Sequence, residues 1–237
     1  KGAILIPGTQ LDNGGLDNAP GGFRYFGPDG AFTFEMVVKL DLMPKESPYI
    51  ALDLLTMEGD GADRVFNFRI EKDGFLVFVP LPHCGASGGA IATIPPKGPH
   101  AINTSDWFHV AVTYNGNGGV TNNVKLFWTR IGSGVAAANH IGSGSLSNDL
   151  NGVLGDLAIG NEARQFFQNT EAEPFPGCID EVRISGVARR PDDFFFVAPE
   201  DRLRETQAEA SPAAPTSQPR FRLALANVLV DSVEKEV

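Results

Sequence analysis

The sequence predicts an all-β protein built as a sandwich of two antiparallel sheets. Three stretches carry this prediction, because each alternates apolar and polar residues with the period of two that a half-buried strand requires. They are residues 31–41, 107–114 and 177–185. The 27 glycines and 17 prolines suit many short strands joined by turns. About ten strands are recognisable in total, which is enough for two packed sheets.

The remaining elements follow from turn signals and apolar runs. Residues 64–71 and 75–79 are predicted to pair around Lys72-Asp73-Gly74, since Asp and Gly favour a tight turn between strands. Residues 107–114 and 123–130 form a second predicted hairpin. Shorter strands are expected at residues 2–7, 23–26, 49–57, 90–94 and 153–159.

Two further segments are predicted from composition. Residues 132–151 are small and polar, so we expect a long loop there. After the last strand, Arg190-Pro-Asp-Asp-Phe194 predicts a short helix, because proline suits the first turn and acidic residues complement the helix dipole there.

The chain is predicted to be one sandwich domain, residues 1–198, followed by an extended tail. Residues 199–219 are rich in Ala, Pro, Glu, Ser and Gln, which is the composition of a linker. Residues 220–237 become apolar again, and their spacing fits both a helix and a strand. We expect this tail to dock on the sandwich, on another copy or on a partner.

The net charge narrows the choice of partners. Lys and Arg together number 19 against 29 Asp and Glu, giving a formal charge of −10. Nucleic-acid binding needs clustered basic residues, so a nucleic-acid partner is not expected. The same charge disfavours anionic membrane surfaces. The sequence has no apolar run long enough for insertion into a bilayer.

Four segments in a fixed order resemble the LamG-like family of concanavalin A-like jelly rolls. They are Trp107-Phe-His-Val-Ala-Val-Thr-Tyr114, Val124-Lys-Leu-Phe127, Leu157-Ala-Ile-Gly160 and Phe175-Pro-Gly-Cys-Ile-Asp-Glu-Val-Arg-Ile-Ser185. The resemblance implies a jelly-roll sandwich over residues 2–198. The sequence departs from the family at Trp128, where the family usually has a small apolar residue.

The resemblance also implies a function. Members of this family mostly bind rather than catalyse, so we expect a non-catalytic binding or adhesion module that recognises a glycan or a protein. We expect it to be secreted, periplasmic or displayed at the cell surface. One alternative is a structural or assembly subunit joined through residues 199–237. Another is an accessory domain of a polysaccharide-active enzyme, since fold alone does not give function.

Calcium is the cofactor that the resemblance implies, with Asp180 as one ligand. Calcium takes six to eight oxygen ligands, so Asp180 needs further partners. The alternative for Asp180 is a solvated strand residue paired with Arg183. A second candidate calcium site is the loop that carries Glu58, Asp60 and Asp63.

The spacing Glu58-x-Asp60-x-x-Asp63 is similar to the E-x-D-x-x-E of jelly-roll glycoside hydrolases. Those enzymes hold their two reacting carboxylates about 5 Å apart on one face of a strand. Here glycines flank the central Asp and the last Glu is an Asp, so we expect no intact catalytic motif and no enzyme.

Residues 161–171 are predicted to be a ligand-binding loop at the rim of the sandwich. The loop combines aromatic rings with amides and charges, the pairing that suits the apolar faces and hydroxyls of sugars. The predicted ligand contacts are Arg164, Phe166, Phe167, Gln168 and Asn169.

Two cysteines, Cys84 and Cys178, leave two interpretations open. They form a disulfide that closes a long loop, or they are separate thiols that behave as small apolar residues.

Overall fold

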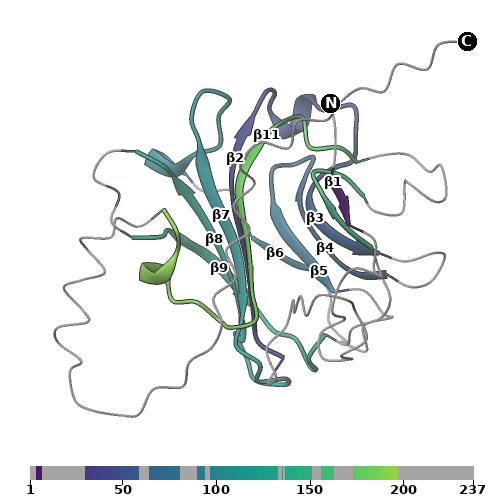
Figure 1. The fold of residues 1–237 in the computed structure, drawn as a ribbon. Helices are drawn as coiled ribbons and strands as arrows, with labels where there is room; N and C mark the ends of the chain where they lie inside the picture. The colour runs from purple at the N-terminus through teal and green to yellow at the C-terminus, as the bar shows by residue number, and fades with distance from the viewer. Residues whose placement is uncertain are drawn as a thin grey trace, which may run out of the picture.

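A computed structural model confirms the antiparallel two-sheet sandwich, drawn in Figure 1. It describes residues 4–6, 30–58, 64–80, 90–93, 97–132, 135, 137–150, 156–162 and 173–196. The strands are β1 (Ile4–Ile6), β2 (Phe32–Leu40), β3 (Ala51–Glu58), β4 (Arg64–Glu71), β5 (Leu76–Pro80), β6 (Ile91–Thr93), β7 (Phe108–Tyr114), β8 (Val124–Arg130), β9 (His140–Gly144), β10 (Asp156–Ile159) and β11 (Gly177–Ser185). Three short 3-10 helices are η2 (Pro44–Glu46), η4 (Gly98–His100) and η5 (Pro191–Asp193).

The strands divide into a six-stranded and a five-stranded sheet. The six-stranded sheet has the order β1-β10-β3-β4-β5-β6, and the five-stranded sheet has the order β11-β2-β7-β8-β9. Strands from the beginning and the end of the chain are neighbours in both sheets, as Figure 1 shows for β2 and β11. The fold therefore depends on pairings between residues far apart in the sequence.

One predicted loop is wrong, because residues 132–151 contain strand β9. This strand includes Gly142 and Gly144, and the small, polar residues of the segment around them had suggested a loop. Both glycines lie against strand β6 of the other sheet. A Cβ atom on Gly142 would lie 2.6 Å from Thr93 Oγ1, and one on Gly144 would lie 2.5 Å from Ile91 Cγ2. The glycines are therefore needed where the two sheets approach each other closely.

Other predictions have mixed outcomes. The helix predicted after the last strand is the single 3-10 turn η5. The strand predicted at residues 23–26 lies outside the described residues, and so does the whole tail, residues 199–237. Within the described part of the chain, no helix has the length and apolar character needed to cross a bilayer.

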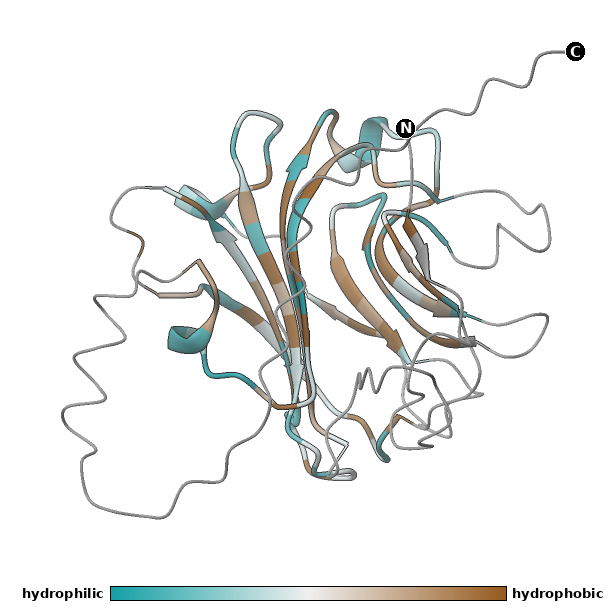
Figure 2. Cartoon of the chain, viewed as in Figure 1, coloured by the Kyte–Doolittle hydropathy of each residue, from teal (hydrophilic) through white to brown (hydrophobic). Residues whose placement is uncertain are grey.

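Aromatic rings from both sheets meet in the core. Phe34 of β2 stacks on Phe66 of β4, with ring centroids 4.9 Å apart. The ring centroid of Phe32 lies 5.6 Å from that of Phe78 on β5 and 5.5 Å from that of Tyr114 on β7. All five side chains are fully buried. Figure 2 shows the corresponding pattern, with hydrophobic residues concentrated in the strands and hydrophilic ones in the 3-10 helices.

Trp128 also belongs to this core. Its side chain is fully buried on β8, and its ring centroid lies 4.9 Å from that of Phe108 on β7. The departure from the family pattern at this position is therefore accommodated by packing against a neighbouring aromatic ring.

Replacing Phe34 with Ala is expected to lower the free energy of unfolding by about 3–5 kcal/mol, because the substitution leaves a cavity between the sheets. Urea denaturation followed by tryptophan fluorescence measures this change. Val120→Ala is the control, since that side chain is 52% exposed and its loss is expected to matter by less than about 0.5 kcal/mol. Equal effects of the two substitutions would contradict the proposed core.

Candidate functional site

Of the eleven predicted site residues, Glu58, Asp180 and Cys178 lie within the described ranges. The predicted residues outside the described ranges are Asp60, Asp63, Cys84, Arg164, Phe166, Phe167, Gln168 and Asn169.

Of the predicted ligand-binding loop, residues 161–171, only residues 161 and 162 are described. Residues 163–172, which include all five predicted ligand contacts, are called the ligand loop below. The described residues on both sides of the ligand loop are tied to the framework of the six-stranded sheet. The N–H of Asp53 on β3 donates to the carbonyl oxygen of Glu173 at 2.9 Å. The N–H of Phe175 donates to the carbonyl oxygen of Gly160 at 3.0 Å, which joins the two ends of the loop to each other. The loop therefore begins and ends at fixed points on a rigid scaffold, which is where binding residues are commonly found.

Four carboxyl groups gather beside the base of the ligand loop. This acid cluster consists of Asp53 and Glu58 on β3, Glu162 before the loop and Glu173 after it. Their exposed fractions are only 0%, 0%, 2% and 7%. Burying this many carboxyl groups together is costly unless protons, cations or hydrogen bonds compensate their charge.

Asp53 is the least compensated member of the acid cluster. Neither of its carboxyl oxygen atoms has a hydrogen-bond partner, and the side chain is completely buried. Burial is the main reason that the pKa of Asp53 is raised well above its usual value of 3.8. The negative charges of Glu173, Glu162 and Glu58 raise it further, whereas Arg69 opposes the shift.

Arg69 on β4 is the positively charged side chain that lowers the pKa of Asp53. Its guanidinium forms ion pairs with Glu71 at 2.7 Å and with Glu173 at 3.4 Å. Burial nevertheless raises the pKa of Glu173, and Arg69 only partly opposes that effect. Arg69 therefore compensates Glu173 only in part, and it forms no hydrogen bond with Asp53.

The acid cluster has the chemistry of a site for a proton or a hard cation, because carboxylate oxygens are the ligands that Ca²⁺ prefers. Among the described residues, no group of three or more His, Cys, Asp and Glu side chains is placed to hold a metal ion. A calcium site at Glu58 therefore requires ligands such as Asp60 and Asp63, which lie outside those residues.

An open pocket of about 500 Å³ lies beside the start of β3 and the end of β4. Lys45, Ile50, Glu71, Lys72 and Asp73 line it. The Lys72 N–H donates to the Ile50 carbonyl oxygen at 3.2 Å, which joins the two loops that form the walls. The ion pair of Glu71 with Arg69 connects this pocket to the acid cluster.

Asp180 lies at an irregularity of β11 between Asp180 and Arg183. Its Oδ1 accepts a hydrogen bond from the N–H of Glu181 at 2.8 Å, and Glu181 adopts a positive φ of 50°. The alternative pairing of Asp180 with Arg183 is not what the structure shows, because Arg183 pairs with Glu35 of β2. Calcium at Asp180 stays a prediction.

Cys178 is an exposed free cysteine on β11. Its predicted partner, Cys84, lies outside the described residues. The disulfide therefore stays a prediction.

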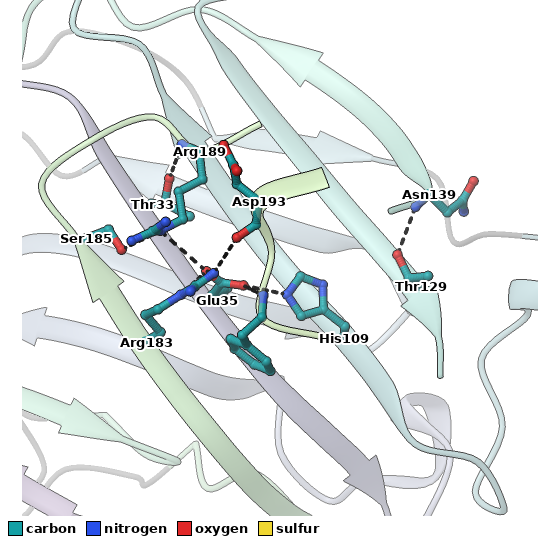
Figure 3. Close-up of polar contacts among 10 residues, drawn as sticks. Thr33, Glu35, His109, Thr129, Asn139, Arg183, Ser185, Arg189 and Asp193 are labelled. Atoms are coloured by element: carbon teal, nitrogen blue, oxygen red, sulfur yellow. Dashed lines mark hydrogen bonds and ion pairs between the residues drawn. The ribbon is translucent and has the colours of Figure 1, made fainter. Parts of the chain in front are cut away.

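The sequence analysis missed a second polar cluster, drawn in Figure 3, on the outer face of the five-stranded sheet. Glu35 of β2 is fully buried there. His109 Nε2 lies 3.0 Å from Glu35 Oε2, and the Arg183 guanidinium contacts Glu35 Oε1. The N–H of Phe195 donates to Glu35 Oε2 at 3.2 Å. One buried carboxylate thus joins β2, β7, β11 and the segment after β11.

A signal for this cluster was present in the sequence. Glu35, His109 and Arg183 each occupy a polar position within a predicted strand. Their convergence depends on the register of β2 against β7 and β11, which alternation alone does not determine.

The comparisons with known proteins agree with this architecture. The sequence profile of the concanavalin A-like lectin/glucanases superfamily matches residues 19–193. The chain belongs to this superfamily. Among curated protein sequences, none matches the chain.

Several solved structures are similar to this superfamily member at low sequence identity. A sialidase CBM40 of Ruminococcus gnavus, bound to α2,3-sialyllactose, is 20% identical, with a TM-score of 0.45 over 81% of this chain and 94% of that one. Domains LG4-5 of the mouse laminin α1 chain are 13% identical, with a TM-score of 0.44 over 83% and 42%. A heptameric SAP-like pentraxin of Limulus polyphemus is 14% identical, with a TM-score of 0.42 over 68% and 66%. The chain thus spans less than half of the laminin fragment.

Replacing Asp53 with Asn tests the uncompensated carboxyl group. The folded-state pKa of Asp53 is raised, so its contribution to stability is fully present below pH 3.8 and is lost as pH rises. The stability of the natural protein relative to Asp53→Asn is therefore expected to fall with rising pH, by at most about 1.4 kcal/mol per pH unit. Urea denaturation in EDTA from pH 4 upward measures the difference.

Asp41→Asn removes an exposed carboxylate and controls for the general effect of charge on stability. Parallel pH dependences for the natural protein and Asp53→Asn would show that Asp53 is compensated in a way that the structure does not reveal.

Proposed function

We propose that the protein is a non-catalytic binding module that recognises a glycan or a protein ligand outside the cell. Its place in a superfamily of lectins and glucanases supports a carbohydrate ligand.

The observation that carries the proposal is a series of contacts that leads from Glu173, which follows the ligand loop, to a pocket. Glu173 fixes the end of the loop to β3 through its carbonyl oxygen and reaches Arg69 through its carboxylate. Arg69 in turn holds Glu71, which lines the pocket. A ligand at the loop would therefore meet a preformed polar row and the exposed side chain of Ile50, which is 69% accessible. Such a mixture of apolar and hydrogen-bonding groups suits a saccharide.

The burial of Glu58 supports binding without catalysis. Glu58 is the first carboxylate of the spacing similar to that of the glycoside hydrolases, and its exposed fraction is 0%. A nucleophile must reach the anomeric carbon of its substrate, which a fully buried carboxylate does not do.

Calcium remains part of the proposal. We place it either at Asp180 or beside Glu58, together with Asp60 and Asp63. The second position is supported by Asp53 of the acid cluster, because a nearby divalent cation would favour the charged form of this buried carboxyl group, which has no hydrogen-bond partner. Assembly through residues 199–237 stays a prediction, since that segment lies outside the described residues.

The double substitution Phe166→Ala/Phe167→Ala is expected to weaken glycan binding about tenfold, because each aromatic ring that packs against a ligand face contributes on the order of 0.5–1.5 kcal/mol by analogy with aromatic pairs. A glycan and polysaccharide array identifies the ligand, and calorimetry with that ligand measures the loss. Trp107→Ala is the matched control, since that aromatic side chain is 36% exposed and precedes a strand of the other sheet. Equal losses in both variants, or binding to no glycan by the folded protein, would contradict a glycan site at the loop.

Calcium is expected to raise the melting temperature of EDTA-treated protein, because a ligand that binds only the folded state stabilises it. Glu58→Gln and Asp180→Asn separate the two candidate positions, since only the variant that removes a true ligand should lose the calcium response. Differential scanning calorimetry with and without calcium measures this. Identical melting in calcium and EDTA would rule out both positions.

A further inference from the structure

Residues 187–196, the C-terminal strap, lie across the outer face of the five-stranded sheet, as Figures 1 and 3 show. Thr33 of β2 anchors the start of the strap: its Oγ1 donates to the Val187 carbonyl oxygen at 2.7 Å and accepts from the Arg189 N–H at 2.8 Å. Near the end, the Phe195 N–H donates to Glu35 Oε2 at 3.2 Å. Two contacts also join the strap to β11: the Arg183 guanidinium donates to the Asp193 carbonyl oxygen at 2.9 Å, and Arg189 Nε donates to Ser185 Oγ at 2.9 Å. The strap is therefore held by polar contacts to β2 and β11.

Three consecutive phenylalanines of the strap enclose His109. The His109 ring centroid lies 4.9 Å from that of Phe194, 5.2 Å from Phe195 and 4.4 Å from Phe196. The imidazole is fully buried. Its Nε2 is paired with Glu35, whereas its Nδ1 has no hydrogen-bond partner.

This enclosure favours the neutral form of His109. A neutral imidazole needs only one N–H donor, and Nε2 supplies it to Glu35. A protonated imidazole carries a second N–H at Nδ1, where the phenylalanine rings exclude both water and an acceptor. Protonation with the strap in place would therefore bury a charged donor without a partner.

The charged groups around His109 do not remove this cost. Glu35 on β2 favours the protonated form, but its carboxylate already contacts Arg183 on β11 and lies 3.9 Å from Arg189 in the strap. On the other side of β7, the residue paired with His109 is the uncharged Thr129 of β8. Burial is the main reason that the pKa of His109 is lowered, and the positive charge of Arg183 adds to the effect.

We propose that His109 is an acid sensor that releases the C-terminal strap. When His109 takes up a proton at Nδ1, water must reach that nitrogen, and lifting the three phenylalanines gives it access. Release uncovers an apolar patch, because Phe194 packs there against Ala111 and Phe127. Mild acid thereby converts a closed face of the five-stranded sheet into an open one.

The direction of the pH dependence follows from the lowered pKa. The seated strap keeps its full stability above the unperturbed value of 6.5 and loses stability as pH falls below it. The equilibrium between seated and lifted strap is expected to change by at most about tenfold per pH unit, until the pKa of the enclosed His109 is reached.

The amide of Phe195 reports directly on the strap, since it donates to Glu35. We expect the hydrogen-exchange protection factor of this amide, measured by NMR, to fall by up to about tenfold between pH 7.5 and pH 5.5. The amide of Phe68 in the other sheet is the control for global unfolding. Parallel falls at Phe195 and Phe68 would overturn a local release.

His109→Gln is the matched variant, because glutamine has an amide donor for Glu35 and does not titrate. Its Phe195 protection factor is expected to be independent of pH over the same range. A fall as large as that of the natural protein would overturn the proposal.

A direct titration keeps the proposal testable if His109→Gln does not fold. The NMR signal of the His109 ring in the natural protein is expected to titrate below pH 6.5, and Phe196→Ala is expected to move the transition toward 6.5 by hydrating the ring. A His109 transition at or above pH 6.5 in the natural protein would overturn the proposal.

Discussion

The buried carboxylate of Glu35 is the constraint on which the five-stranded sheet depends. A fully buried carboxylate requires cationic and hydrogen-bonding partners, and removing them costs several kcal/mol. The partners of Glu35 come from β7, β11 and the strap, so satisfying one side chain fixes the arrangement of three other segments. The last strand is thereby tied to the second by electrostatics as well as by main-chain pairing.

The buried acidic residues of the two sheets differ in whether their carboxyl groups have partners. Glu35 is surrounded by donors and serves the fold, whereas Asp53 on the other sheet has no hydrogen-bond partner for its carboxyl group. Several acidic side chains beside an uncompensated buried carboxyl group lower the free energy of unfolding unless protons or cations neutralise their charge. This contrast is why the acid cluster, and not the Glu35 cluster, is the better candidate for a function that involves a ligand.

Alternation and turn chemistry predicted the sandwich, because residues such as Phe32, Phe34 and Val38 lie on one buried face of β2 at every second position. Strand β9 escaped prediction because its glycines carry no hydrophobic signal and are explained only by contacts with Ile91 and Thr93. The site was harder to predict. Asp53 lies in an apolar run of the sequence. Its grouping with Glu162 and Glu173 depends on strand pairings between distant parts of the chain, and no local sequence pattern encodes those pairings.

The position of β11 has a consequence for how the chain folds during synthesis. Glu35 and Arg183 are 148 residues apart, so β2 cannot complete its sheet until nearly all of the sandwich has left the ribosome. Until then β2 presents a bare edge to solvent with an acidic group that lacks its arginine. Contacts between residues so far apart in the sequence slow folding and favour aggregation-prone intermediates. Burying the charge of Glu35 is costly in the finished protein. During synthesis the same charge keeps the unpaired edge of β2 soluble and disfavours its pairing with a neighbouring nascent chain.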